Sequence, residues 1–203
     1  ARLHARLVER ALRTAVAARC GRVELQCAPR LRHSFFAALA KRHRVTLRAQ
    51  GRGDLGARMQ RAFERALRAA GAAVLIGSDC PALRTADLRA AMRALGHGAD
   101  AVLAPAEDGG YALIGLRRAS RRLFAGVAWG GADVLARTRR RLARLGWRWV
   151  ELRTLWDVDR PEDYARLVRS RLLAKSPPPA STVRRGARRS AGSPARSGGS
   201  GRI

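Results

Sequence analysis

The chain has 203 residues, of which 47% are hydrophobic, enough for one α/β domain with a buried core. Its 42 Lys and Arg residues outnumber 15 Asp and Glu residues and give a formal net charge of +27. The three cysteines lack metal-ligand spacing, which argues against a disulfide framework or a structural zinc site and favours a reducing cytoplasm, and no apolar run has transmembrane length.

The positive charge would ordinarily indicate a nucleic-acid or anionic-surface partner. Only Lys41 and Lys175 are lysines, however, and arginine and alanine are spread along the whole chain, so we attribute the charge to GC-rich codon usage. A non-catalytic protein whose basic surface and tail bind nucleic acid is the open alternative. The same bias makes each acidic residue informative, because it stands against the background composition.

The apolar patterns predict alternating helices and strands. Helices are expected at residues 1–19, 34–42, 85–95, 132–145 and 161–171, and strands at 23–27, 45–49, 73–76, 101–105, 111–116 and 147–152. A further helix after Asp54 is expected to bury Met59, Phe63, Ala66, Leu67 and Ala70. Ser34 and Asp54 are predicted helix caps, and Pro161 suits the first turn of the last helix.

The strand at 73–76 carries four apolar residues without alternation, which is typical of a strand covered on both faces in a parallel sheet. Asp79 falls just past its carboxyl end, where open α/β sheets bind ligands. Val45–Ala49 instead alternates, as an edge strand does. Asp79 is therefore the first candidate site residue.

Residues 1–173 are predicted to form one domain and 174–203 a disordered basic tail. From Ser176 onward the chain consists mainly of Pro, Ser, Gly and Arg, which cannot bury enough apolar surface to fold.

Gly51–Gly56 reads GxGxxG between a predicted strand and a predicted helix, the dinucleotide-binding pattern. In that fold the preceding strand is buried on both faces, whereas Val45–Ala49 alternates, so the pattern gives only weak support to an NAD-binding oxidoreductase. A glycine-rich turn followed by a capped helix is the simpler interpretation.

Acidic residues gather at predicted strand ends and before the last helix: Asp79, Glu107, Asp108, Asp157 and Asp159. Carboxylate oxygens of this kind suit Mg²⁺ or Mn²⁺ bridging to substrate phosphates. Taken singly, each residue has a simpler role as a cap or a turn residue. Together they predict a divalent metal site.

Five segments, in this order, resemble the bacterial DUF2064 family: QGRGDLGARM, VLIGSDCPAL, APAEDGGYALIGL, FAGVAWGGADVL and WDVDRPEDYARL. The resemblance implies a Rossmann-like α/β fold of the GT-A (nucleotide-diphospho-sugar transferase) type, a three-layer sandwich with a mostly parallel sheet. It also implies a metal-dependent transferase that takes a nucleotide sugar or an NTP as donor and a small molecule as acceptor. Glycosyl transfer is preferred, and nucleotidyl transfer of the kind catalysed by cofactor-pathway guanylyl- and cytidylyltransferases is the alternative.

The resemblance also implies roles for individual residues. The expected metal ligands are Asp79, Asp157 and Asp159, with Mg²⁺ or Mn²⁺ as cofactor, and the expected catalytic residues are Asp79 and Asp108. The expected nucleotide-binding residues are Gln50, Gly51, Gly53 and Asp54, and the expected acceptor-binding residues are Glu107, Gly109, Gly110 and Trp129.

Members of this family begin with a strand and a phosphate-binding loop rich in Gly and Lys, whereas this sequence enters at the following helix. We therefore expect a truncated domain with its first strand missing, and unpaired backbone groups on the two strands that would flank it. An inactive fragment is the corresponding alternative.

Overall fold

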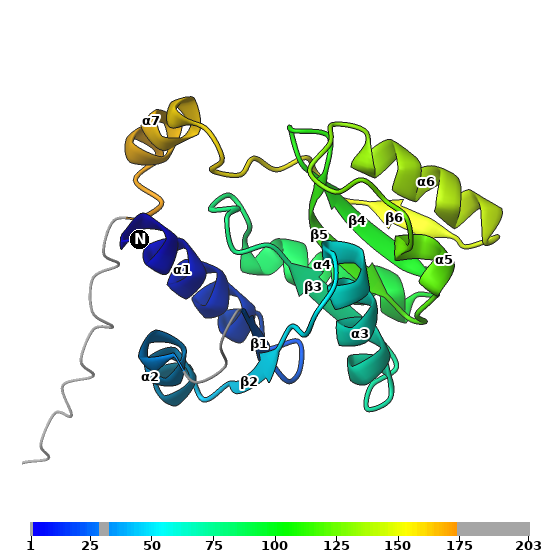
Figure 1. The fold of residues 1–203 in the computed structure, drawn as a ribbon, viewed down its shortest axis with the longest axis horizontal. Coiled ribbons are helices and arrows are strands. Elements are labelled where there is room, and N and C mark those ends of the chain that lie inside the picture. Colours follow the sequence, from blue (N-terminus) through cyan, green and yellow to red (C-terminus); the bar gives the residue numbers. More distant parts are fainter. Residues whose placement is uncertain (1, 29–32, 174–203) are drawn as a thin grey trace, which may run out of the picture.

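The structure is a computed structural model that describes residues 2–28 and 33–173 (Figure 1). Its helices are α1 (Arg2–Ala18), α2 (Ser34–His43), α3 (Leu55–Leu67), α4 (Thr85–Gly96), α5 (Arg121–Phe124), α6 (Val134–Arg144) and α7 (Pro161–Ser170). Its strands are β1 (Glu24–Cys27), β2 (Thr46–Ala49), β3 (Ala73–Ile76), β4 (Ala101–Pro105), β5 (Tyr111–Leu116) and β6 (Trp149–Glu151). The predicted tail at 174–203 lies outside the described residues.

The strands form two sheets. β1 and β2 pair in parallel, and the other four strands have the order β3-β5-β4-β6. β4 is parallel to β6, whereas β5 is antiparallel to both β3 and β4. The predicted α/β architecture with a mostly parallel sheet is confirmed, because β3, β4 and β6 run in the same direction and β5 is the reversed strand of the four. β5 follows β4 through a short turn, and such a connection produces an antiparallel pair.

The strand predicted at 73–76 forms at those residues, but it lies at an edge of its sheet. Among the described residues, β3 pairs only with β5, and all four of its apolar side chains are partly exposed. β1 likewise pairs only with β2. The prediction that Val45–Ala49 lies at an edge is confirmed, because β1 is the one described strand that pairs with β2.

Helices cover both faces of the four-stranded sheet. Val102 and Ala104 of β4 pack in a cluster with Ala91 and Leu95 of α4. The alternate residues Ala101 and Leu103 pack in a second cluster, with side chains from α3, α5 and α6 that include Phe63, Phe124 and Leu142. Because successive side chains of a strand point to opposite faces, β4 is apolar throughout. No helix in the described ranges is long and apolar enough to cross a membrane.

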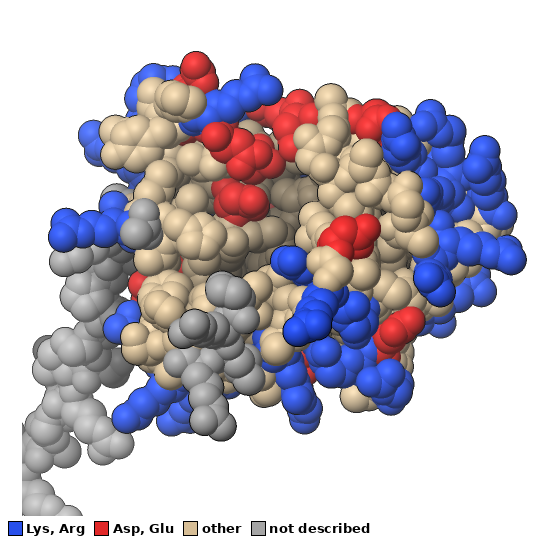
Figure 2. All heavy atoms as spheres, viewed as in Figure 1, with Lys and Arg blue, Asp and Glu red and all other residues tan. Residues whose placement is uncertain are grey.

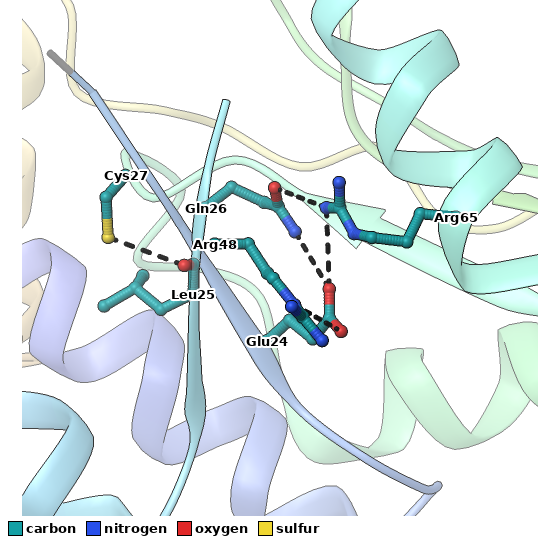
Figure 3. Close-up of polar contacts among 6 residues, drawn as sticks. All are labelled: Glu24, Leu25, Gln26, Cys27, Arg48 and Arg65. Carbon is teal, nitrogen blue, oxygen red and sulfur yellow. Dashed lines mark hydrogen bonds and ion pairs between the residues drawn. The ribbon is translucent and has the colours of Figure 1, made fainter. Parts of the chain in front are cut away.

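Polar side chains connect the two-stranded sheet to α3 (Figure 3). Arg65 of α3 donates a 2.9 Å hydrogen bond to Gln26 Oε1 and lies 3.6 Å from Glu24 Oε2. Arg48 of β2 lies 3.3 Å from Glu24 Oε1. Side-chain contacts therefore hold β1 and β2 against α3 at this point.

Two of the predicted helix starts are confirmed and one is corrected. Asp54 Oδ1 accepts a 2.8 Å hydrogen bond from Ala57 N, and Pro161 is the first residue of α7. Ser34 is already the first helical residue of α2, because the Nδ1 of His33 accepts from Phe35 N and makes His33 the cap. The expected burial of Ala70 is also wrong, since α3 ends at Leu67 and Ala70 is exposed.

Candidate functional site: an acidic cluster beside α7

Three carboxylates from two separate segments meet beside the start of α7. Asp108 lies in the turn between β4 and β5, and Asp157 and Asp159 lie in the segment between β6 and α7. Each residue places a carboxylate oxygen within 4.8 Å of an oxygen of the other two. Asp157 is partly buried, whereas Asp108 and Asp159 are exposed. The group is therefore open to a ligand from solvent.

The Asp108 turn is fixed by its two glycines. Gly109 has φ of +90°, and a Cβ at this position would collide with the Ala132 carbonyl. Gly109 O also accepts a 2.9 Å hydrogen bond from Leu135 N, and Gly110 N donates at 2.8 Å to Asp108 Oδ1. Gly109 and Gly110 are among the expected acceptor-binding residues, but at Gly109 the neighbour that approaches closely is the chain's own backbone.

Main-chain hydrogen bonds bring the acidic segments together. Leu155 N donates to Pro105 O at 2.8 Å, and Glu107 N donates to Leu155 O at 3.0 Å. Val158 N donates to Asp79 O at 3.0 Å. The loop after β3, the β4–β5 turn and the segment before α7 thus form one continuous surface.

The electrostatic surroundings place Asp79 beside the same cluster. Burial, followed by the charges of Asp108 and Asp159, raises the pKa of Asp157 to about 6. Burial, followed by the charges of Asp79 and Asp108, raises the pKa of Asp159. Asp79 acts on both carboxylates, although it does not belong to the group of three with mutual spacing within 4.8 Å. Repulsion of this kind is relieved by a proton or by a bound cation.

Seven carboxylates in the described ranges hold an arginine within 4.0 Å: Glu9 with Arg42, Glu24 with Arg48, Asp87 with Arg153, Asp100 with Arg118, Glu107 with Arg166, Asp133 with Arg137 and Glu151 with Arg139. In the described part of the chain, neither Asp79 nor any of the three cluster aspartates forms such a pair. Asp54, Glu64, Glu162 and Asp163 form none there either, so it is the close grouping of the carboxylates that distinguishes the cluster. Figure 2 shows acidic side chains gathered around a hollow, while Lys and Arg cover the flank over α5 and α6. Hard oxygen donors in this arrangement fit Mg²⁺ or Mn²⁺.

The predicted nucleotide-binding residues form a second region, at the carboxyl ends of β1 and β2. A pocket of about 640 Å³ there is lined by Cys27, Ala28, Ala49, Gly51, Arg52, Gly53 and Arg58. The side chain of Gln50 holds this loop, because Nε2 donates to Gln26 O at 3.2 Å and Oε1 accepts from Arg58 at 3.3 Å. The Asp54 side chain caps α3.

The predicted acceptor-binding residues are divided between two places. Glu107 turns toward α7 and forms an ion pair with Arg166. Trp129 packs against Phe124 with a 6.4 Å separation of ring centroids, and its indole nitrogen is buried without a hydrogen-bond partner in the described residues. A Cβ on Gly56 would collide with this indole ring. The structure therefore places Trp129 in the packing between α3 and α5.

Comparison with known proteins identifies the family to which this chain belongs. The family model "Uncharacterized protein conserved in bacteria (DUF2064)" matches residues 11–131, more than half of the chain. The chain belongs to the DUF2064 family. No curated protein matches this DUF2064 protein.

A solved structure is similar to the DUF2064 chain over most of its length. It is that of a candidate nucleotide-diphospho-sugar transferase from Desulfovibrio desulfuricans G20. The TM-score is 0.74 at 29% sequence identity, and the match covers 90% of this chain and 77% of the other. The predicted Rossmann-like GT-A fold is thereby confirmed.

Three residues at these sites were missed by sequence reasoning. Arg52 and Arg58 line the pocket, and Arg166 contacts Glu107 beside the acidic cluster. Because the chain has 42 basic residues, the sequence alone could not distinguish these three arginines from the others. Asp108 was expected to act in catalysis, and the structure groups its carboxylate with the expected metal ligands Asp157 and Asp159.

Proposed function

We propose that this DUF2064 protein transfers a glycosyl group from a nucleotide-diphospho-sugar to a small-molecule acceptor, with Mg²⁺ or Mn²⁺ as cofactor. The observation that carries this proposal is the likeness to the Desulfovibrio desulfuricans protein, because it extends over 90% of the chain at 29% sequence identity. The acidic cluster, in which three carboxylates lie within 4.8 Å of one another, supports it independently.

Asp108, Asp157 and Asp159 would hold the ion, and Asp79 adds negative charge beside them. A divalent ion bound there would neutralise charge on the diphosphate of the leaving nucleotide. The residues present fit this role, because Mg²⁺ and Mn²⁺ prefer carboxylate oxygens and usually keep several waters. The raised pKa of Asp157 is consistent with carboxylates that repel each other until a cation binds.

The pocket at the ends of β1 and β2 would bind the donor nucleotide. Arg52 and Arg58 line it and offer positive charge to an anionic ligand, and Gly51 and Gly53 expose backbone groups. Gln50 and Asp54 would act by holding the loop in place.

The acceptor would enter from the other side of the acidic cluster. The predicted acceptor-side residues are Glu107, Gly109, Gly110 and Trp129. Of these, Glu107 and the Asp108–Gly110 turn lie next to the cluster.

The test is product analysis with a panel of nucleotide sugars and Mn²⁺. We expect release of a nucleoside diphosphate, and a rate lowered at least about 100-fold by Asp157→Asn, since the loss of residues that only orient metal ligands already costs about 10–100-fold. The matched control is Glu64→Gln, which neutralises an exposed carboxylate that accepts a hydrogen bond from Gln60 on α3, and it should leave the rate unchanged.

Two outcomes would contradict the proposal. Pyrophosphate released from an NTP would identify nucleotidyl transfer as the activity. Absence of both products across the panel, from a folded protein that binds Mn²⁺, would oppose both transfer reactions.

A further inference from the structure

We propose that Arg166 is a positioning residue that aligns the two acidic segments so that their carboxylates can share one metal ion. This inference rests on the proposed function, because it concerns the same metal site. It assigns a role to a residue of α7 that bears no metal-binding group itself.

One guanidinium contacts the residues directly before two of the cluster aspartates. Arg166 donates to both carboxylate oxygens of Glu107, at 2.7 and 3.1 Å, and Glu107 immediately precedes Asp108. The Cζ of Arg166 also lies 4.5 Å from the ring centroid of Trp156, which immediately precedes Asp157. Arg166 therefore links the β4–β5 turn to the segment before α7.

The start of α7 is attached to the third aspartate. Asp163 Oδ2 accepts from Arg160 N at 2.9 Å and from Asp159 N at 3.2 Å. Asp163 and Arg166 are three residues apart and thus lie on neighbouring turns of one helix face. Through these two side chains, α7 contacts both segments that supply the cluster.

Arginine is suited to this task in a way that lysine is not. Its planar fork binds a carboxylate through two parallel hydrogen bonds while its face stacks on an aromatic ring, whereas the ammonium of lysine is a flexible point charge. The Arg166 and Glu107 side chains are 43% and 52% exposed, so their ion pair contributes little to global stability. Its contribution is to orientation.

The chain offers a matched control in Arg139 of α6. Arg139 donates to both carboxylate oxygens of Glu151 on β6, at 2.8 and 2.6 Å, and its side chain is 44% exposed. It therefore reproduces the bidentate chemistry of the Arg166 pair and the exposure of its arginine, while Glu151 is 27% exposed and Glu107 is 52% exposed. Neither Arg139 nor Glu151 contacts a cluster residue through any bond that the structure gives.

The experiment is calorimetric titration of the full chain with Mn²⁺, together with a thermal melt of each variant. We expect Arg166→Gln to raise the Mn²⁺ dissociation constant about tenfold, the usual scale for residues that orient metal ligands. Arg166→Lys should bind nearly as weakly, because it keeps the charge but loses the fork and the stacking. Arg139→Gln should bind as the wild type does, and the two Gln variants should melt at similar temperatures. Glu107→Gln, which removes the other half of the pair, should repeat the loss.

Three results would overturn the inference. Wild-type affinity in both Arg166→Gln and Glu107→Gln would show that the pair does not position the ligands. Full recovery in Arg166→Lys would show that charge alone matters. Failure of the wild type itself to bind Mn²⁺ would contradict the proposed metal site, and the role of Arg166 with it.

Discussion

At the scale of single residues, Asp157 combines partial burial with three neighbouring carboxylates that oppose its ionisation. Burial comes first among the causes that raise its pKa to about 6, followed by Asp108 and Asp159, with Asp79 last. In the unfolded chain the same group has an ordinary pKa near 3.8. Because the pKa is higher in the folded state, the folded chain binds this proton more tightly than the unfolded chain does. The protonated Asp157 therefore favours folding at low pH, and this contribution to the free energy of unfolding is lost as the pH rises through about 6.

The contribution of Asp157 should therefore make the metal-free protein more stable as the pH falls from 7 toward 4.5. Over the same range the Mn²⁺ affinity should fall, because a proton competes with the ion for Asp157. Asp157→Asn should stabilise the metal-free form at pH 7 by about 1 kcal/mol after allowance for solvent screening at a half-exposed site. Thermal melts at several pH values check both statements. A wild type and an Asp157→Asn variant with identical pH profiles would contradict the assignment.

Gly109 offers a second test at this scale. Gly109→Ala combines a left-handed φ of +90° with a collision against the Ala132 carbonyl, and we expect it to cost about 3 kcal/mol. Gly126→Ala is the matched control, because Gly126 has φ of +63° but an added methyl group would meet nothing within 4 Å, so only the conformational cost of about 1 kcal/mol remains. Urea unfolding measures the difference. Equal losses would show that the turn can move away from Ala132.

At the scale of elements, β3 has an edge that no other described strand covers. Its backbone N–H groups point alternately toward β5 and toward this uncovered edge. Gly77 N donates to Ala112 O at 3.0 Å, and in an antiparallel pair every second residue is hydrogen-bonded in this way. The Leu75 amide therefore faces β5, and those of Val74 and Ile76 face the unpaired edge.

We expect the amides of Val74 and Ile76 to exchange with solvent faster than that of Leu75. Hydrogen exchange followed by NMR reads these residues individually, and the paired strand β4 between β5 and β6 supplies protected reference amides. Equal protection of all three β3 amides would mean that another strand or chain covers this edge in solution.

The elements also show how far the sequence could be interpreted. Local patterns predicted β3, β4 and β5 at their observed residues, because an apolar strand reflects two covered faces. Those patterns contain no information on which edge is paired, so the edge position of β3 was missed. The direction of β5 depends on the Ala106–Gly110 turn, which was interpreted as a ligand-binding feature and not as a reversal.

The sequence predicted the kind of site, a group of carboxylates suited to a divalent metal ion, better than the set of residues that forms it. Scarce acidic residues at strand ends indicated Asp79, Asp157 and Asp159, but the grouping of Asp108 with them depends on how the glycine turn packs against Ala132. Arg166 could not be selected, because its role follows from two contacts across the fold, to Glu107 and Trp156.

At the scale of the whole molecule, a chain with a formal charge of +27 carries a small acidic centre. The summed field of such a chain attracts anions over a distance that ionic strength shortens. Arg140 and Arg144 are exposed residues of α6, and Figure 2 shows Lys and Arg side chains over α5 and α6.

We therefore expect the association rate of a nucleoside diphosphate to fall as salt is added. Neutralising Arg140 and Arg144 together should slow association and leave dissociation unchanged, whereas Arg58→Gln, in the pocket, should speed dissociation. Stopped-flow measurements separate the two rates. A dissociation rate that changes in the flank variant would show direct contact with the ligand and not a long-range effect.

The contrast between the basic chain and its acidic cluster has a thermodynamic consequence. A free cation is repelled by the molecule and attracted only by the cluster, whereas a free nucleotide is attracted by the molecule and repelled by the cluster. Each ligand removes the charge that opposes the other, so their binding should be positively cooperative. By linkage, the factor by which Mn²⁺ tightens nucleotide binding must equal the factor by which the nucleotide tightens Mn²⁺ binding. Where one of the two ligands is scarce, the other would bind with only its weaker, uncoupled affinity.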